Sequence, residues 1–322
     1  MTDGAPETKK PRLGISTCLL GERVRYDGGH KHDRYLTDTL GKFVEWVPVC
    51  PEVECGLPTP REAMRLVGDP QNPRLVTRKT GIDQTHRMQR WAKERLTELD
   101  RENLDGYIFK ANSPSSGMER VKVYDANGVP RKVGVGIWAR AFKEHFPLLP
   151  TEEEGRLHDL AIRENFIERV FCLARYRAFK QTDGGRGGLV AFHADHKLLL
   201  MSHSQSILRE MGRLVAQAKA FRPKELLAKY EALMLRALTF KATPRKHANV
   251  LQHMMGYFKK VLSAEEKLEL LEVIDDFKRE LTPLVVPVTL MRHYARKYHE
   301  PYLKRQTYLT PHPAELKLRN HP

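Results

Sequence analysis

Three of the four cysteines stand where they could bind a metal ion or cluster. Cys50 and Cys55 flank the four residues between them in CPEVEC, and Cys18 follows the apolar run LGIS. On spacing alone, ordinary buried cysteines and a metal site both stay open. Thiolates are soft ligands, and three of them without an evident fourth fit a cubane iron–sulfur cluster with one open iron better than a closed tetrahedral zinc site. Cys172 lies among apolar residues at helical spacing and is expected to be structural.

Oxygen-bearing side chains that could act beside such a site occur in the same segments. Glu52 follows the second cysteine and a proline, which makes it a candidate general acid or base, although it could also be a solvated loop carboxylate. Ser113, Ser115 and Ser116 in SPSSG could bind a substrate or orient a water molecule, and Ser-Pro also begins turns. Asp27 precedes two glycines in a predicted turn that could approach a substrate.

The elements that carry these residues predict an α/β domain. Apolar, β-branched runs at residues 13–21, 43–50 and 106–110 predict strands, and residues 85–103 show apolar positions at helical spacing. Strands that alternate with helices favour a largely parallel sheet, whose ligand sites lie beyond the carboxyl ends of the strands. Three strand ends could therefore converge on one site.

The second half of the chain predicts an all-α domain. Residues 146–159 form a proline-bounded run that meets an acidic cluster, and the sequence beyond them is helical in pattern almost throughout. We therefore divide the chain into a disordered N-terminus at residues 1–10, a first domain at 11–150 and an all-α domain at 151–322. No apolar run is long enough to cross a membrane, and the N-terminal residues lack an apolar signal core, so we expect a cytoplasmic protein.

The positive charge is concentrated in the second half. The chain carries a formal net charge of +15, whereas residues 1–155 hold 25 basic and 23 acidic residues. The remainder is therefore strongly basic, which favours a polyanion such as RNA as partner. Basic residues interleaved with tyrosines near the C-terminus are candidate RNA contacts, although each tyrosine could equally pack in the core. These candidates are Arg292, Arg296, Lys297, Lys304 and Arg305.

A histidine-rich stretch in the second half raises the question of a further metal site. FHADHKLLLMSHS brings His193, His196 and His203 close together in sequence. No carboxylate pattern completes a ligand set, so packing is the favoured interpretation of these histidines.

Three motifs resemble one family. STCLLGERVRYDGGHK, VPVCPEVECGLPTPRE and FKANSPSSGMERVKVY resemble the DUF523 family over residues 11–145. Characterised members of that family are thiouracil desulfidases with a [4Fe-4S] cluster held by three cysteines. From EEEGRLHDLAIRENFIERVF onward the chain resembles the DUF1722 (YbgA-like) domain. The pairing resembles fused proteins that remove sulfur from 4-thiouridine in transfer RNA.

The resemblance implies roles for particular residues, with one departure. Shorter relatives read CPEVLGG and SPSCG, whereas this chain reads CPEVECG and SPSSG, so Ser116 stands where the third cysteine is expected. We therefore hypothesise that Cys55 supplies the third thiolate, beside Cys18 and Cys50. Glu52 matches the family's catalytic glutamate, and Ser113 is favoured as a second catalytic residue by its motif position. Asp27, Ser115 and Ser116 are assigned to substrate binding.

The function that this implies is iron–sulfur-dependent, non-redox conversion of 4-thiouridine in transfer RNA to uridine. Two alternatives stay open: a desulfidase of free thiouracil-type bases, and a non-catalytic, metal-containing RNA-binding module. The expected cofactor is a [4Fe-4S] cluster and the expected partner is transfer RNA. We expect no membrane partner, and no feature of the sequence requires a protein partner.

Overall fold

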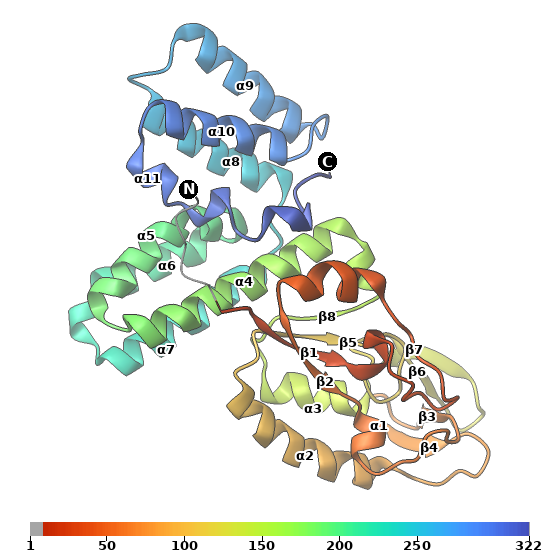
Figure 1. Cartoon of the computed structure of the whole chain (residues 1–322). Helices are drawn as coiled ribbons and strands as arrows, with labels where there is room; N and C mark the ends of the chain where they lie inside the picture. Colours follow the sequence, from red (N-terminus) through yellow and green to blue (C-terminus); the bar gives the residue numbers. More distant parts are fainter. Residues whose placement is uncertain (1–8, 322) are drawn as a thin grey trace. The chain divides into compact units, whose positions relative to one another are not determined.

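The computed structural model describes residues 9–321, which form parts of two compact units, Met1–Asp159 and Leu160–Pro322. Most of the N-terminal segment predicted to be disordered, residues 1–10, lies outside the described residues. The first unit is α/β with a parallel sheet and the second is helical, as Figure 1 shows, which confirms the predicted fold class. In the part of the chain that is described, helices long and apolar enough to span a membrane do not occur.

The first sheet positions the site. Its strand order is β2-β1-β5-β8, and all of its neighbouring strands are parallel. The strands are β1 (Arg12–Ser16), β2 (Glu45–Val49), β5 (Gly106–Phe109) and β8 (Thr151–Glu153). The first three confirm strands predicted from apolar runs. The fourth lies just beyond residue 150, so the first unit extends into the segment that the sequence assigned to the second domain.

Helices α2 (Thr85–Glu102) and α3 (Ile137–His145) pack on each other in the first unit. Tyr107 of β5 is fully buried and accepts a hydrogen bond from the indole nitrogen of Trp138 in α3 at 3.1 Å. A Cβ atom at Gly14 of β1 would lie 2.2 Å from the Tyr107 ring, so glycine is required for this ring to pack against the strand. The result is a rigid aromatic layer beneath the central strands.

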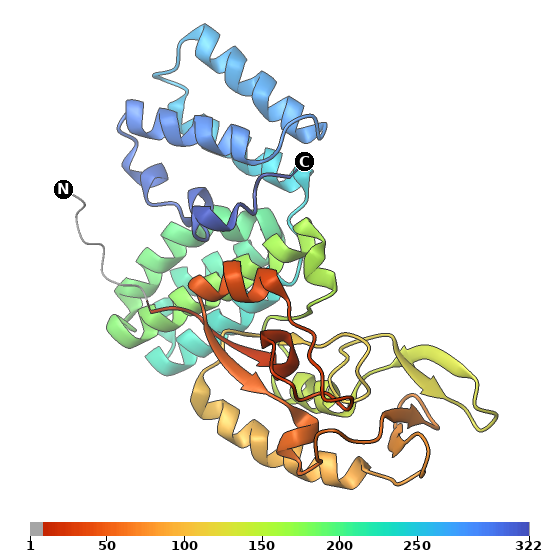
Figure 2. The same cartoon turned by 45° about the vertical axis from the view of Figure 1, so that its right-hand side comes forward.

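A second sheet was not predicted. Its order is β4-β3-β6-β7, with β3 and β6 parallel and the two outer pairs antiparallel. Its strands are β3 (Met64–Val67), β4 (Arg74–Thr77), β6 (Val121–Tyr124) and β7 (Pro130–Gly134). One face buries Leu66, Leu75 and Val123 with residues of α2 and α3. Figure 2 shows β6 and β7 as a ribbon that extends from the first unit.

The second unit is built from α4 to α11. These helices are α4 (Leu160–Thr182), α5 (Arg186–His203), α6 (Gln205–Ala216), α7 (Pro223–Leu238), α8 (Pro244–Met255), α9 (Ala264–Lys278), α10 (Val285–Lys297) and α11 (Pro301–Lys304). Within this half, which the sequence predicted to be helical almost throughout, the chain is interrupted at Ser204, whose side chain caps α6 by accepting a hydrogen bond from the Ile207 amide. Arg319 ties the C-terminal segment to α4 through Glu164 at 3.2 Å and Glu168 at 2.7 Å.

Candidate active site

The carboxyl ends of three parallel strands meet at one edge of the first sheet. Cys18 lies in the 3-10 turn η1 (Thr17–Leu20) that follows β1, and Cys50 caps the short helix α1 (Pro51–Glu54) that follows β2. The loop after β5 carries Ser113, Ser115 and Ser116. Parallel pairing places these ends side by side, which is the usual position of ligand sites in such sheets.

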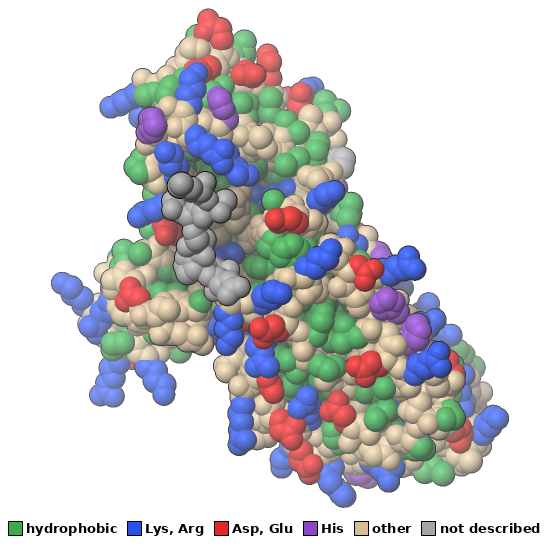
Figure 3. Space-filling model, viewed as in Figure 1, with side chains coloured by type: hydrophobic (Ala, Val, Ile, Leu, Met, Phe, Trp, Pro, Cys, Tyr) green, Lys and Arg blue, Asp and Glu red, His purple; other side chains and the backbone are tan. Residues whose placement is uncertain are grey.

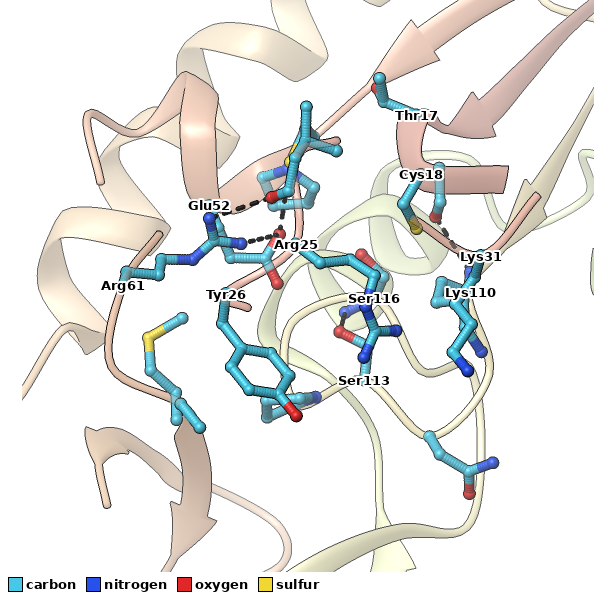
Figure 4. Close-up of a pocket in the computed structure, with 18 of the residues that line it drawn as sticks. Thr17, Cys18, Arg25, Tyr26, Lys31, Glu52, Arg61, Lys110, Ser113 and Ser116 are labelled. Atoms are coloured by element: carbon cyan, nitrogen blue, oxygen red, sulfur yellow. Dashed lines mark hydrogen bonds and ion pairs between the residues drawn. The ribbon is translucent and has the colours of Figure 1, made fainter. Parts of the chain in front are cut away.

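These segments enclose a cavity of about 320 Å³. It is lined by both buried thiols together with carboxylate, hydroxyl and cationic side chains. In the view of Figure 4, Glu52 and Arg61 lie on one side, Cys18, Lys31 and Lys110 lie on the other, and Arg25 lies between them. The lining includes Ser16, Thr17, Cys18, Arg25, Tyr26, Lys31, Cys50, Glu52, Arg61, Arg78, Lys110, Asn112, Ser113 and Ser116.

Glu52 is held from three directions. The Ser115 hydroxyl donates to its Oε1 at 2.5 Å, the Cys50 thiol donates to its Oε2 at 3.7 Å, and the Arg61 guanidinium lies 3.9 Å from Oε2. Arg61 is itself anchored by a 3.0 Å hydrogen bond to the Val24 carbonyl. The carboxylate side chain is only 14% exposed, so its position is defined by these contacts and not by solvent.

The serine loop is built around Ser113. Its Oγ accepts a hydrogen bond from the Ser116 amide at 3.2 Å and lies 2.8 Å from the Ser115 Oγ. Ser115 is fully buried and does not line the cavity, so it supports Glu52 from beneath, whereas Ser113 and Ser116 face the cavity. A Cβ atom at Gly136 would lie 2.3 Å from the Ser115 carbonyl oxygen, which shows how closely the loop is backed by the chain before α3.

Only two of the three candidate cysteine ligands line the cavity. Cys18 and Cys50 line the cavity, while the Cys55 thiol donates to the Glu52 carbonyl oxygen at 3.3 Å. Cys55 lines a different pocket beside Trp91 and packs against the core beneath the second sheet. Burial, reinforced by the Glu52 charge, raises the pKa of the Cys18 thiol to about 11 and that of Cys50 to about 12.

Cationic side chains of the cavity were not identified from the sequence. Arg25 and Arg61 occur within two of the quoted motifs, in VRYDGG and PTPRE, and this is the signal that could have found them. Lys110 is paired with Glu154. Asp27 is exposed and outside the lining; its carboxylate accepts from the Gly29 amide at 3.0 Å, and that hydrogen bond lowers the pKa of Asp27.

The predicted RNA contacts of the second unit are partly engaged in ion pairs. Lys297 lies 2.6 Å from Glu266 and Arg305 lies 3.4 Å from Asp195. Arg292 is partly exposed, and Arg296 and Lys304 are exposed.

The three histidines singled out from the sequence of the second unit pack or form hydrogen bonds. His196 stacks on Phe192 at 3.8 Å, and His203 lies 3.2 Å from Glu168. His193 contacts the Tyr230 hydroxyl at 3.2 Å. These contacts are consistent with the packing interpretation of the three side chains.

Two buried thiols beside a carboxylate and several hydroxyls define a pocket suited to metal-assisted or acid–base chemistry. Residues 13–154 match the family 2-thiouracil desulfurase, and residues 197–313 match a family described as a protein of unknown function, DUF1722. The chain belongs to the 2-thiouracil desulfurase family through its first half and to the DUF1722 family through its second.

Individual proteins match each half. The uncharacterized protein YbgA of Escherichia coli is 31% identical over 158 residues, which cover 49% of this chain and 94% of YbgA. The uncharacterized protein YbbK of Bacillus subtilis is 29% identical over 139 residues, 40% of this chain and 88% of YbbK. A solved structure described as the [4Fe-4S]-dependent thiouracil desulfidase TudS is 31% identical and covers 48% of this chain and 98% of that chain, with a TM-score of 0.40. The family assignment rests on the sequence matches.

Proposed function

We propose that this protein is a [4Fe-4S]-dependent desulfidase that converts 4-thiouridine in transfer RNA to uridine without net oxidation or reduction. The observation that carries the proposal is the shared cavity of Cys18, Cys50 and Glu52 with the Ser113 and Ser116 hydroxyls. Membership of the 2-thiouracil desulfurase family supports the reaction class, and TudS, which is 31% identical, is described as [4Fe-4S]-dependent.

Two of the three proposed cysteine ligands, Cys18 and Cys50, are placed where they could hold a cluster. Cys18 and Cys50 present buried sulfur atoms to the cavity, and soft thiolates are the ligands that iron–sulfur clusters require. We propose Cys55 as the third ligand. In this structure its thiol lies on the other side of α1, so ligation requires the short helix to turn or Cys55 to change rotamer.

When bound, such a cluster supplies an iron with an open position that polarises a carbon–sulfur double bond as a Lewis acid. Side chains of the protein would then transfer the protons and orient the water molecule. Glu52 accepts a proton from water as it adds to the carbon and returns one to the departing sulfur, and Ser113 orients the water or the base. Thiocarbonyl and water become carbonyl and hydrogen sulfide, so no electron donor is needed.

Transfer RNA is the proposed substrate because the chain carries far more positive charge than a neutral base requires. Figure 3 shows Lys and Arg side chains over both units in that view. A polyanion is attracted by such a surface through the release of counterions, whereas free thiouracil gains nothing from it. Arg292, Arg296, Lys297, Lys304 and Arg305 are proposed RNA contacts of the second unit.

The test begins with anaerobic reconstitution of the full chain and measurement of bound iron and sulfide. Transfer RNA that contains 4-thiouridine is then added while its near-ultraviolet thiocarbonyl absorbance is followed. Loss of the band only in the presence of the cluster supports the proposal. Equal turnover of free thiouracil, without salt dependence, favours the free-base alternative.

Variants separate the remaining roles. Glu52→Gln should keep its iron and lose turnover, whereas a binding module would be unaffected. Cys55→Ala should lose iron relative to Cys172→Ala, a matched control because Cys172 is buried within the second unit and does not line the cavity. Full iron loading in Cys55→Ala would reject the third-ligand assignment and direct the next substitution to Ser116.

A further inference from the structure

A second cavity of about 360 Å³ adjoins the candidate active site within the first unit. Met64, Arg78, Asn112 and Pro114 line both cavities, so the two hollows share a wall along the same surface. The two cavities are therefore neighbours, close enough for different parts of one extended ligand to occupy both.

The second cavity is cationic. Arg65, Arg78, Lys122 and Lys132 contribute to its lining, and no acidic residue among those described does. Among the described residues 9–321, Arg78, Lys122 and Lys132 have no ion-pair partner. Four cationic groups, three of them without an ion-pair partner in the described part of the chain, make a concave surface that attracts anions.

The second sheet places these charges in a row. Val121 and Val123 of β6 face the core, so Lys122 and Tyr124 between and after them face outward. Lys122 stands directly opposite Lys132 of β7 in the strand register. Like charges paired across two strands are destabilising, and a bound anion relieves that repulsion. The arrangement thus lowers the stability of the empty ribbon in favour of a charged ligand.

An aromatic ring lies within the same lining. The Arg65 guanidinium lies over the Tyr124 ring, 5.2 Å from its centroid, and Tyr124 is partly exposed. Cationic groups interleaved with an aromatic face are the elements that bind single-stranded nucleic acid, by phosphate contact and base stacking. An acidic peptide would use the cations but would gain no comparable stacking from the ring.

We propose that the groove formed by Arg65, Arg78, Lys122 and Lys132 binds the phosphate backbone of the RNA strand whose thiolated nucleotide occupies the adjoining cavity. This proposal rests on the proposed desulfidase function. It places an RNA contact in the first unit, which carries almost no net charge over residues 1–155. The net charge of a whole domain can be near zero even when cationic side chains cluster on one part of its surface.

The test is the double variant K122Q/K132Q in the full, cluster-loaded chain. Its matched control is K42Q/K143Q, which removes two exposed lysines of the same unit that lie outside both cavities. For RNA containing 4-thiouridine, at about 0.1 M salt, the dissociation constant should rise by about tenfold or more in K122Q/K132Q. The slope of log affinity against log salt should fall by roughly 1.4, the value for two lost single-strand phosphate contacts.

Two further measurements keep the groove separate from the chemistry. Bound iron and the turnover of free 4-thiouridine nucleoside should stay at the wild-type level in K122Q/K132Q. An unchanged RNA dissociation constant and salt slope would overturn the groove assignment, as would an equal loss of affinity for a polyglutamate chain, which would indicate an acidic protein ligand.

Turnover by the wild-type chain distinguishes failure of the desulfidase proposal from failure of the groove proposal. If it turns over no thiolated substrate while K122Q/K132Q still loses RNA affinity, the desulfidase proposal is rejected and the RNA groove stands. If it turns over thiolated RNA and K122Q/K132Q does so with unchanged kcat/KM, the groove is rejected and the desulfidase proposal stands.

Discussion

Replacement of Ser115 by alanine tests whether the carboxylate of Glu52 is positioned from beneath. The Ser115 hydroxyl is fully buried, outside the cavity lining, and 2.5 Å from the Glu52 Oε1. The substitution removes this donor without removing any atom that a substrate could touch. It also leaves the Ser113 hydroxyl, 2.8 Å away, without that neighbour.

The expected magnitude follows from the type of hydrogen bond. A hydrogen bond to a charged acceptor contributes about 1.5–3 kcal/mol, and Glu52 is largely shielded from water that could replace it. If that contribution is lost in the transition state, kcat should fall by about 10- to 150-fold, because 1.36 kcal/mol corresponds to a factor of ten. KM and bound iron should stay near their wild-type values, since the cavity wall and its thiols are unchanged.

The assay is steady-state turnover of thiolated RNA together with iron content and chemical denaturation. Ser202→Ala is the matched control, because Ser202 is also fully buried but its hydroxyl donates only to the Leu199 carbonyl within α5. Ser202→Ala should lose stability but keep its kcat, whereas Ser115→Ala should lose kcat. Wild-type kcat in Ser115→Ala, or a kcat loss matched by iron loss, would refute the positioning role.

Three further predictions concern packing and buried charge. Gly136→Ala should lose turnover and about 1–3 kcal/mol of unfolding free energy in denaturant titrations, since its Cβ meets the Ser115 carbonyl at 2.3 Å; Gly187→Ala, with nothing within 4 Å, should change stability by less than about 1 kcal/mol. Burial lowers the pKa of His247 to about 3. Between about pH 6.5 and 3, His247 is therefore protonated in the unfolded chain and neutral in the folded chain. Stability should therefore fall on acidification by about 1.4 kcal/mol per pH unit from this group, and His247→Gln should show a shallower slope between pH 7 and 5. Arg319→Met removes the permanently charged partner of the buried carboxylates Glu164 and Glu168 of α4, which keep His321 and His203 as partners, and should destabilise the second unit by about 3–5 kcal/mol, measured by thermal unfolding against wild type.

The sequence predicted best those elements whose pattern is local. Helix α7 (Pro223–Leu238) lies in the half predicted to be helical, and proline at its first position and regular apolar spacing mark its start and its buried face. The strands before Cys18 and Cys50 were equally evident, since buried parallel strands read as continuous apolar runs.

The second sheet was missed because its strands carry weak patterns. β6 alternates Val121, Lys122 and Val123, but it is four residues long, and β7 is mostly exposed and begins with a proline. Such strands are stabilised by the core that they cover on one face, and that core is completed by residues of other elements, α2 and α3. Tertiary packing, and not local preference, determines this part of the fold.

The candidate site shows the same division between local pattern and three-dimensional placement. Parallel strand ends explain why Cys18, Cys50 and Glu52 share a cavity, and this could be anticipated from the sequence. The direction of Cys55 could not, because it depends on how the chain turns through the short helix α1 between Cys50 and Cys55. Spacing places two cysteines near each other without determining which face each one takes. Whether Cys55 binds iron therefore depends on the free energy needed to turn α1, set against the thiolate–iron bond gained, and the iron content of Cys55→Ala measures the outcome directly.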